Sequence, residues 1–465
     1  MTHGVLGWPR SRSGLVMPLG VLAAVTVRYV APFDPAGATM LAITTFCIAL
    51  WIGNVVPPAY TGVIGIGLIG LAFSLDLALS GFRSPATWLI AFGLVMGEAT
   101  RRSGLAAWSG QWIIDRVTPD EPTRNPKRTY RRLLLGLSTA GLLLVLVIPV
   151  GIVRVLVVAP VALEIGDRFD ARRAKLGLFF APVLTTYLAT AAVLTGGSPN
   201  IVVLGIFQSA TGTSIAWGEW FLLLFPLMGV GRMLLIVGVV YLLYRPSGSL
   251  QIERVGSAPG RLDDSQRRML VFLLAGVAVW VTDVLHGLHP VYGAMLVAVL
   301  AFLPRVGIAD FDDTVGEIDF SILFFVAAVL AIGEGLTRTN VAASLARQLL
   351  GIVPADASLV VVLLIVFSFT VLLMFVVSGL AAASVVTPVV IAFATDAGLP
   401  LLPVTLAEAV ALSMPFFPYQ SAVLVVILAY QIVEADELIR VVSAVTIATI
   451  LVLIPIQLGV LAAVG

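Results

Sequence analysis

An arginine, Arg154, lies inside an apolar run that extends from Leu133 to Ile165. An arginine at membrane depth is costly and faces a cavity or a partner, and its planar guanidinium suits a carboxylate, sulfate or phosphate-like oxyanion. Two interpretations stay open: Arg154 contacts an anionic ligand, or it bonds to backbone carbonyls or to a carboxylate such as Glu164. The run bends just before this arginine, and the bend is predicted to line the same binding site through Val150, Gly151 and Ile152.

Three other apolar segments break in the same way at small or polar residues. Glycine and proline interrupt a helix, and the backbone groups that they free survive at membrane depth only beside a cavity. Half-helix N-termini that point at such a cavity favour an anion, so the breaks are predicted to bind substrate. The alternative is that their polar side chains only satisfy the broken backbone. The predicted contacts are Ser198, Pro199 and Asn200, then Ser378, Gly379 and Leu380, and finally Pro418, Tyr419 and Gln420.

Candidate groups for a coupling ion lie at and beside these breaks. Glu408 precedes the last break and is the candidate proton carrier if it faces the transport core; alternatively it is a helix-end carboxylate at the outer surface. Sodium needs several oxygen ligands. Backbone carbonyls at four positions are predicted to supply them, at Gly151, Gly196, Ser378 and Gly379. No other metal and no organic cofactor is predicted.

The composition fixes the environment in which these residues act. The chain has 465 residues, of which 59% are hydrophobic and 11% charged, and its mean hydropathy is +1.06. Such long apolar runs belong in a bilayer, so the chain is predicted to be an integral membrane protein. The net charge of +1 gives no sign of a nucleic-acid partner. The lone cysteine, Cys47, excludes a disulfide framework and a zinc cluster.

An intramembrane enzyme is not predicted. Such an enzyme would need a zinc motif of the His-Glu-x-x-His kind or a pair of facing aspartates. The histidines stand at positions 3, 286 and 289 and form no such motif. A channel is disfavoured as well, because the repeat described below is typical of a moving carrier.

Basic residues indicate the topology. Arg131 and Arg132 precede the run that contains Arg154, and Arg172 and Lys175 follow it, so the run is predicted to enter and leave the membrane on the cytoplasmic side as a re-entrant hairpin. The N-terminus is then cytoplasmic, in a plasma (inner) membrane. Most of the 27 Lys and Arg fall on the cytoplasmic side. Three are predicted to lie outside, namely Arg83, Arg338 and Arg347, and three within spans, namely Arg28, Arg154 and Arg232.

The second half of the chain repeats the first. Gly333-Glu334 corresponds to Gly97-Glu98, and a second overlong apolar run, 359–394, breaks at Ser378. The pattern predicts an all-α polytopic fold with about eleven membrane-spanning helices, two re-entrant hairpins and two broken helices in an inverted repeat. In the first repeat we expect scaffold helices at 1–86, then a span, an interfacial helix (105–117), a hairpin and a broken helix at 87–212, with a transport core at 131–212. In the second repeat we expect scaffold helices at 213–317, then a span, an external hairpin and a broken helix at 318–430, with a transport core at 357–430. A last helix is expected at 431–465.

These segments resemble one known family over nearly the whole chain. Trp280-Val-Thr-Asp283-Val-Leu-His286-Gly287 is similar to a family motif, as are the prolines of the hairpin arms, Pro160 and Pro388. The Gly196 to Asn200 break looks like a shortened form of the family's Gly-Thr-Pro-Pro-Asn. The chain is therefore similar to the divalent anion/sodium symporter (DASS) family of the ion transporter superfamily. In the family the hairpin tips carry Ser-Asn-Thr, of which only Ser378 remains here.

The resemblance implies a secondary active transporter of small, divalent anions such as dicarboxylates or sulfate. It also implies an elevator mechanism, in which a transport domain moves against a scaffold that forms a homodimer. Coupling to sodium, coupling to protons and plain exchange stay open, because most of the family's side-chain ligands for sodium are replaced. The alternative is a cation/proton antiporter of the same superfamily, for which the chain offers Glu408 as the only midplane carboxylate.

Overall fold

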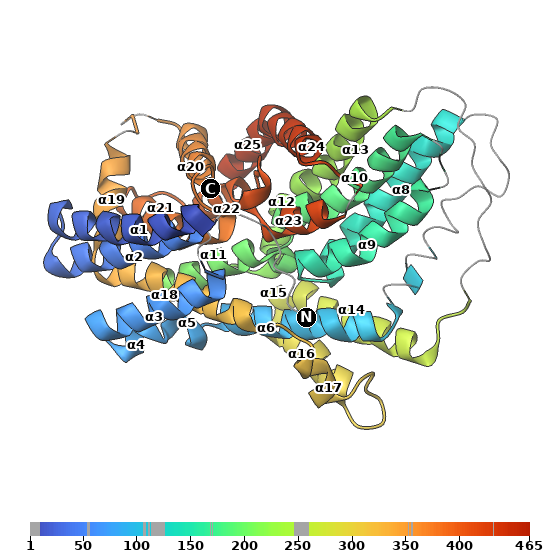
Figure 1. The fold of residues 1–465 in the computed structure, drawn as a ribbon, viewed down its shortest axis with the longest axis horizontal. Coiled ribbons are helices and arrows are strands. Elements are labelled where there is room, and N and C mark those ends of the chain that lie inside the picture. Colours follow the sequence, from blue (N-terminus) through green and yellow to red (C-terminus); the bar gives the residue numbers. More distant parts are fainter. Residues whose placement is uncertain are drawn as a thin grey trace. The chain divides into compact units, whose positions relative to one another are not determined.

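The part of the chain that the computed structural model describes is built of helices (Figure 1). The structure describes residues 10–53, 56–105, 108–109, 112, 126–167, 169, 171–245, 260–351, 353–354, 357–430 and 432–465. Seven helices within these ranges are long and apolar enough to cross a membrane, which agrees with the all-α polytopic fold predicted from the sequence. The predicted interfacial helix at 105–117 falls mostly outside the described residues.

The chain forms two compact units. The first contains Met1–Thr87, Val202–Thr213 and Asp319–Glu408, and the second contains Trp88–Ile201, Ser214–Ile318 and Ala409–Gly465. Three helices continue from one unit into the other, namely α6 (Pro85–Arg102), α11 (Ser198–Thr211) and α22 (Leu401–Ala411).

The first unit is built around one helix, α18 (Ser321–Arg338), which packs against most of its neighbours. Figure 1 shows α1 and α2 side by side in this unit, and they are in contact. Its other helices are α1 (Arg10–Val30), α2 (Pro35–Gly53), α3 (Pro58–Ala72), α4 (Leu75–Ala78), α5 (Ser80–Arg83), α19 (Val341–Leu350), α20 (Leu359–Met374) and α21 (Gly379–Asp396).

Glycines let neighbouring backbones approach α18 closely, as small residues do where membrane helices pack. A Cβ atom on Gly62 of α3 would lie 2.6 Å from the carbonyl oxygen of Phe324. A Cβ atom on Gly81 of α5 would lie only 2.0 Å from the carbonyl oxygen of Ala327. Because both obstacles are backbone atoms of α18, any larger residue at Gly62 or Gly81 would push the helices apart.

The second unit contains the segments that carry most of the predicted site. Its helices are α8 (Pro126–Val147), α9 (Gly151–Gly166), α10 (Arg172–Leu188), η1 (Ala189–Ala192), η2 (Leu194–Gly196), α12 (Trp217–Leu224), η3 (Phe225–Gly231), α13 (Arg232–Leu243), α14 (Asp264–Val281), α15 (Asp283–His286), α16 (Val291–Phe302), α17 (Phe311–Gly316), η4 (Pro418–Gln420), α23 (Ala422–Ala429), α24 (Ala435–Ala448), η5 (Thr449–Leu453) and α25 (Ile454–Val464).

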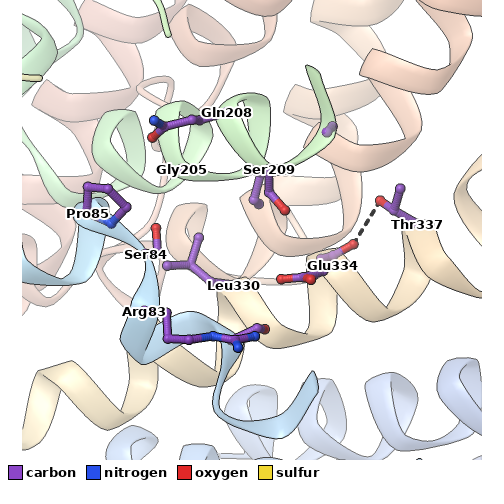
Figure 2. Close-up of a pocket in the computed structure, with 13 residues that line it drawn as sticks. Arg83, Ser84, Pro85, Gly205, Gln208, Ser209, Leu330, Glu334 and Thr337 are labelled. Carbon is purple, nitrogen blue, oxygen red and sulfur yellow. Dashed lines mark hydrogen bonds between the residues drawn. The ribbon is translucent and has the colours of Figure 1, made fainter. Parts of the chain in front are cut away.

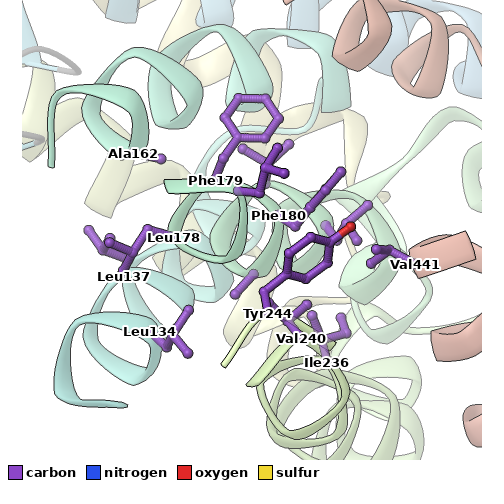
Figure 3. Close-up of a cluster of buried hydrophobic side chains, with 14 of the residues drawn as sticks. Leu134, Leu137, Ala162, Leu178, Phe179, Phe180, Ile236, Val240, Tyr244 and Val441 are labelled. Atoms are coloured by element: carbon purple, nitrogen blue, oxygen red, sulfur yellow. The ribbon is translucent and has the colours of Figure 1, made fainter. Parts of the chain in front are cut away.

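Helix α10 is the centre of the second unit. Its side chains are buried on all sides between α8, α9 and α13, as expected for a helix that is apolar all round. Figure 3 shows Phe179 and Phe180 of α10 in this cluster of buried side chains, with Val240 of α13 and Tyr244 beside them. Helix α10 is thereby held in place, and its C-terminal end adjoins the first broken segment.

Both repeats contain the same sequence of elements, which agrees with the recurrence seen in the sequence. The paired helices α8 and α9 correspond to α20 and α21, and the broken pair α10 and α11 corresponds to α22 and α23. The π-helical turns η3 and η5 are a further match that the sequence did not suggest. Glu98 pairs with Arg102 and Glu334 with Arg338, each four residues later on its helix, so these glutamates bind arginines at helix ends in both repeats.

Candidate functional site

The first hairpin bends at the residues that the sequence indicated. Helix α8 ends at Val147 and α9 begins at Gly151, with Val150 in extended conformation between them. The first backbone N–H groups of α9 have no partner within their own helix, as at any helix N-terminus. Helix α9 packs against α23, and a Cβ atom on Gly151 would lie 3.2 Å from a methyl group of Val423. The bend therefore lies close to the second broken segment.

The first broken helix unwinds earlier than the sequence suggested. The sequence placed this break at Gly196 to Asn200, whereas α10 already ends at Leu188 and two 3-10 turns lead to α11 at Ser198. Pro199 lies in the first turn of α11, where its missing N–H costs nothing. Indole N–H groups help to satisfy the unwound stretch, since Trp220 Nε1 donates to the carbonyl of Ala191 over 2.9 Å.

Arg154 joins the hairpin bend, the last turn of α10 and the 3-10 turn η2 through their backbone carbonyls. Its Nε donates to Thr186 at the end of α10 over 3.1 Å, and its Nη2 donates to Gly196 over 2.8 Å. Its Nη1 donates to Ile148 at the bend of the hairpin. The side chain is fully buried, and each of its nitrogens has a carbonyl partner. Helix ends leave carbonyls unsatisfied, and a cation is favourable there, so Arg154 matches both requirements.

A second buried arginine, Arg232, does the same for the second broken segment. Its Nη1 donates to the carbonyl of Leu188 over 2.8 Å and to Ser413 Oγ over 2.9 Å, and its Nη2 donates to the carbonyl of Ser413 over 2.8 Å. Its Nε is buried and has no hydrogen-bond partner among the described residues. The Tyr187 hydroxyl interacts with Ser421 and lies close enough to the Arg232 guanidinium to interact with its charge. Sequence reasoning missed Tyr187 and Ser413, because neither lies in a glycine or proline motif.

Of the two amide side chains at the breaks, one donates hydrogen bonds to the backbone and the other accepts them. Asn200 donates through Nδ2 to the carbonyls of Thr190 and Val193, each over 2.9 Å. Gln420 accepts through Oε1 from the backbone N–H groups of Phe416 and Phe417, over 2.6 and 2.7 Å. Both amides therefore hold broken backbone. Asn200 Oδ1 makes no hydrogen bond with the described residues, so Asn200 presents an acceptor rather than a donor to a ligand.

The remaining residues predicted to contact substrate differ in solvent exposure, and they belong to different compact units. Pro418 and Tyr419 belong to η4, and the Tyr419 side chain is exposed and stacks on Phe417. Ser198 begins α11 and its hydroxyl makes no hydrogen bond with the described residues. The second hairpin tip belongs to the first unit, where Ser378 precedes α21, which begins with Gly379 and Leu380.

Glu408 also belongs to the first unit and is fully buried. Its Oε1 accepts a hydrogen bond from Thr387 Oγ1 over 2.7 Å, and its Oε2 has no partner among the described residues. The hydroxyl of Thr405, one turn earlier on α22, likewise has none. The sequence did not indicate Thr387 as a partner, because it lies on a different helix, α21.

The Trp280 to Gly287 motif has a structural role in the second unit. Asp283 is buried and accepts hydrogen bonds from the backbone N–H groups of Trp217 and Gly218. It thus caps the first turn of α12, where a negative charge is favourable. Gly287 has a φ of +63°, which glycine adopts without strain. The motif closes a turn and starts a helix, so it shapes the unit without belonging to the site.

The described residues fit sodium poorly at one of the predicted positions. The carbonyl of Gly196 already accepts a hydrogen bond from the guanidinium of Arg154, and a second cation beside it would be repelled. No group of three or more His, Cys, Asp or Glu side chains that could hold a metal occurs in the described part of the chain. Gly151, Ser378 and Gly379 stay predictions as sodium ligands.

Known proteins match the chain over most of its length. It is 24% identical to the L-tartrate/succinate antiporter of Escherichia coli strain K12 over 449 residues, which cover 86% of this chain and 88% of that protein. The L-tartrate/succinate antiporter of Shigella flexneri matches at the same identity and coverage. The crystal structure of the YdaH transporter of Alcanivorax borkumensis has the same fold, with a TM-score of 0.60 at 16% identity over 93% of this chain and 99% of that one.

The family described as "Sodium:sulfate symporter transmembrane region" matches residues 14–461. This is the family that the motif, the two hairpins and the two broken helices resemble. The chain therefore belongs to the sodium:sulfate symporter family and is an integral membrane transporter rather than an enzyme.

Proposed function

We propose that this protein exchanges small dicarboxylates of the succinate and tartrate class, or sulfate, across the membrane without coupling to sodium. The relatives that match over most of the chain are antiporters of tartrate and succinate. We further propose that it works as a homodimer by an elevator mechanism, which the repeated hairpins and broken helices favour.

The charges of the second unit support a divalent anion. Arg154 and Arg232 are fully buried there, and neither pairs with a carboxylate among the described residues. Buried charges are costly unless an opposite charge compensates them. Both guanidiniums reach carbonyls in the last turn of α10, Thr186 and Leu188, so two positive charges lie close together. A substrate with two negative charges would balance them.

Backbone groups at the breaks are the proposed contacts of the substrate. The N-termini of α9 and α11, at Gly151 and Ser198, offer N–H groups and the positive ends of helix dipoles to carboxylates or sulfate. Arg232 adds its Nε, which has no hydrogen-bond partner among the described residues. Arg154 then contributes its charge, while its nitrogens stay on the carbonyls.

The observation that carries the absence of sodium coupling is the bond between Arg154 Nη2 and the Gly196 carbonyl. Sodium would need carbonyl oxygens of this kind. At Gly196 a guanidinium that is part of the chain binds this oxygen instead and cannot dissociate. A carrier that binds no sodium cannot use a sodium gradient to drive uptake, which favours exchange of one anion for another.

Counterflow in proteoliposomes tests the proposal. Vesicles loaded with unlabelled succinate are expected to take up external labelled succinate, tartrate or sulfate at the same rate in sodium and in potassium buffers. Empty vesicles are expected to take up little. Strong uptake into empty vesicles that requires an inward sodium gradient would overturn the exchange proposal.

A proton-coupled mode is the second candidate, and Glu408 favours it. An ionised carboxylate without a cation is unfavourable at membrane depth, so Glu408 is proposed to bind a proton there. Proton binding would then accelerate uptake as the external pH falls from 8 to 6. Sulfate is the appropriate substrate, because it stays divalent over this range.

Glu408→Gln is expected to keep sulfate exchange within about threefold of the wild-type rate, since a glutamine oxygen can still accept from Thr387. Its rate should no longer depend on pH. Exchange is measured at four pH values for both proteins. A pH profile of Glu408→Gln that parallels the wild-type profile would exclude Glu408 as the proton carrier.

A further inference from the structure

A cavity of about 220 Å³ with several polar residues on its walls lies within the first unit. Three segments form its walls: the corner between α5 and α6, the last turns of α11, and the C-terminal half of α18. Figure 2 shows Arg83 and Glu334 on its walls, with Gln208 and Ser209 of α11 above them. We call this cavity the outer pocket, because Arg83 is one of the three basic residues that the topology predicted from the sequence places outside.

A chain of four charges fixes two of its walls. Arg83 Nη1 binds Asp76 Oδ1 over 2.6 Å, and Arg338 Nη1 binds Asp76 Oδ2 over 3.3 Å. Arg338 also donates to Glu334. The hydrogen bond from Arg83, followed by that from Arg338, holds the pKa of Asp76 below its ordinary value. Asp76 therefore stays ionised in mildly acidic medium and keeps Arg83 in place.

The outer pocket contains polar atoms without partners. Ser80 Oγ is buried, with the residue 7% exposed, and it makes no hydrogen bond among the described residues. The Gln208 Oε1 position is likewise buried and unpartnered. Buried polar groups without partners cost free energy, and native structures contain few of them. Ser80 and Gln208 both line the cavity, so a side-chain rotation that turns either group into it would let a ligand satisfy that group.

The chemistry of the walls defines the ligand. Arg83 and the Ser80 hydroxyl donate hydrogen bonds, which suits a carboxylate. Glu334 only accepts, so the other end of the ligand must carry a hydroxyl or an ammonium group. The four charges sum to zero, and a carboxylate placed against Glu334 would be repelled unless a hydroxyl or ammonium group beside it donates a hydrogen bond to Glu334. Succinate, which has no donor group, is therefore excluded.

We infer that the outer pocket is a second binding site, which takes a small carboxylate bearing a hydroxyl or ammonium group from the outer side of the membrane. The site is separate from the breaks of the second unit and does not depend on the proposed exchange. Its occupant would bridge α11 and α18, which belong to different repeats.

Equilibrium titration of the purified full-length protein with labelled ligands tests the inference, because binding is measured without transport. Tartrate and malate are the hydroxyl probes, aspartate is the ammonium probe, and succinate is the probe without a donor. We expect at least one of tartrate, malate and aspartate to bind to two classes of site with different dissociation constants. Succinate should bind to one class. Arg83→Gln should weaken the second class about tenfold or more, while succinate counterflow stays within about twofold.

Two further variants keep the test independent of folding. Glu334→Gln removes the negative wall, so succinate should gain a second class of site, a result that mere loss of structure does not produce. Arg347→Gln is the matched control, because among the described residues Arg347 donates to Ser344 Oγ alone and it does not line the cavity. A single class of site for every probe, or equal losses in Arg83→Gln and Arg347→Gln, would overturn the inference. Failure of counterflow with two intact binding classes would count against the exchange proposal alone.

Discussion

Arg154→Gln is expected to lower succinate counterflow by about a hundredfold or more. The substitution removes a fully buried guanidinium and leaves the carbonyls of Ile148, Thr186 and Gly196 without their donors. Each buried carbonyl that loses its partner costs about 1–3 kcal/mol, so the hairpin bend and the broken helix should separate. The readouts are counterflow in proteoliposomes and the apparent melting temperature in detergent, which should also fall.

The lysine variant separates the charge of Arg154 from its geometry. Arg154→Lys keeps a positive charge but cannot reach three carbonyls with a planar fork, so it should recover part of the activity and remain insensitive to sodium. Residual uptake by Arg154→Gln should instead rise with sodium, because the Gly196 carbonyl is vacated. Wild-type rates and melting temperatures in both variants would contradict this account of the site.

Gly62→Ala is expected to destabilise the first unit by about 1–3 kcal/mol. The new Cβ atom would lie 2.6 Å from the carbonyl oxygen of Phe324 and 3.1 Å from the Cα atom of Phe325. Both atoms belong to the backbone of α18, which cannot yield as a flexible side chain would. The measurement is the apparent melting temperature of the purified protein, which should fall by several degrees.

Gly67→Ala on the same helix, α3, is the matched control. A Cβ atom there would have no heavy atom within 4 Å, and alanine favours a helix over glycine by about 1 kcal/mol. The same substitution should therefore raise the melting temperature at position 67 and lower it at position 62. Equal effects at the two positions would show that the contact with α18 is unimportant.

The sequence was sufficient to locate the two hairpin bends, because proline and glycine act locally. Pro149 and Gly151 mark the first bend, and Gly379 begins α21 as the repeat predicted. Local signals such as these depend on backbone conformation, which a residue type limits by itself. Long apolar runs indicated the membrane spans for a similar reason, since a bilayer requires a minimum length.

The sequence could not show where α10 ends. Ala189–Ala192 would continue a helix on propensity alone. The helix ends because two side chains donate hydrogen bonds to carbonyls around its last turn. Arg232 is distant in the chain, and Asn200 lies beyond the break. The partners of Arg154 were equally hidden, since one lies 42 residues away at Gly196. Its bonds to carbonyls were one of the two interpretations that the sequence left open.

The way Arg154 binds has a consequence for the evolution of this family member. Its three partners are main-chain oxygens, an atom that every amino acid provides. Ile148 and Thr186 are therefore free to drift to other residue types, while Arg154 is not. Substitutions at the two ends of these bonds will not compensate one another. Correlated substitutions in an alignment would therefore not detect the contacts of Arg154 with these three segments. Coordinates or mutagenesis of Arg154 would be needed to detect them.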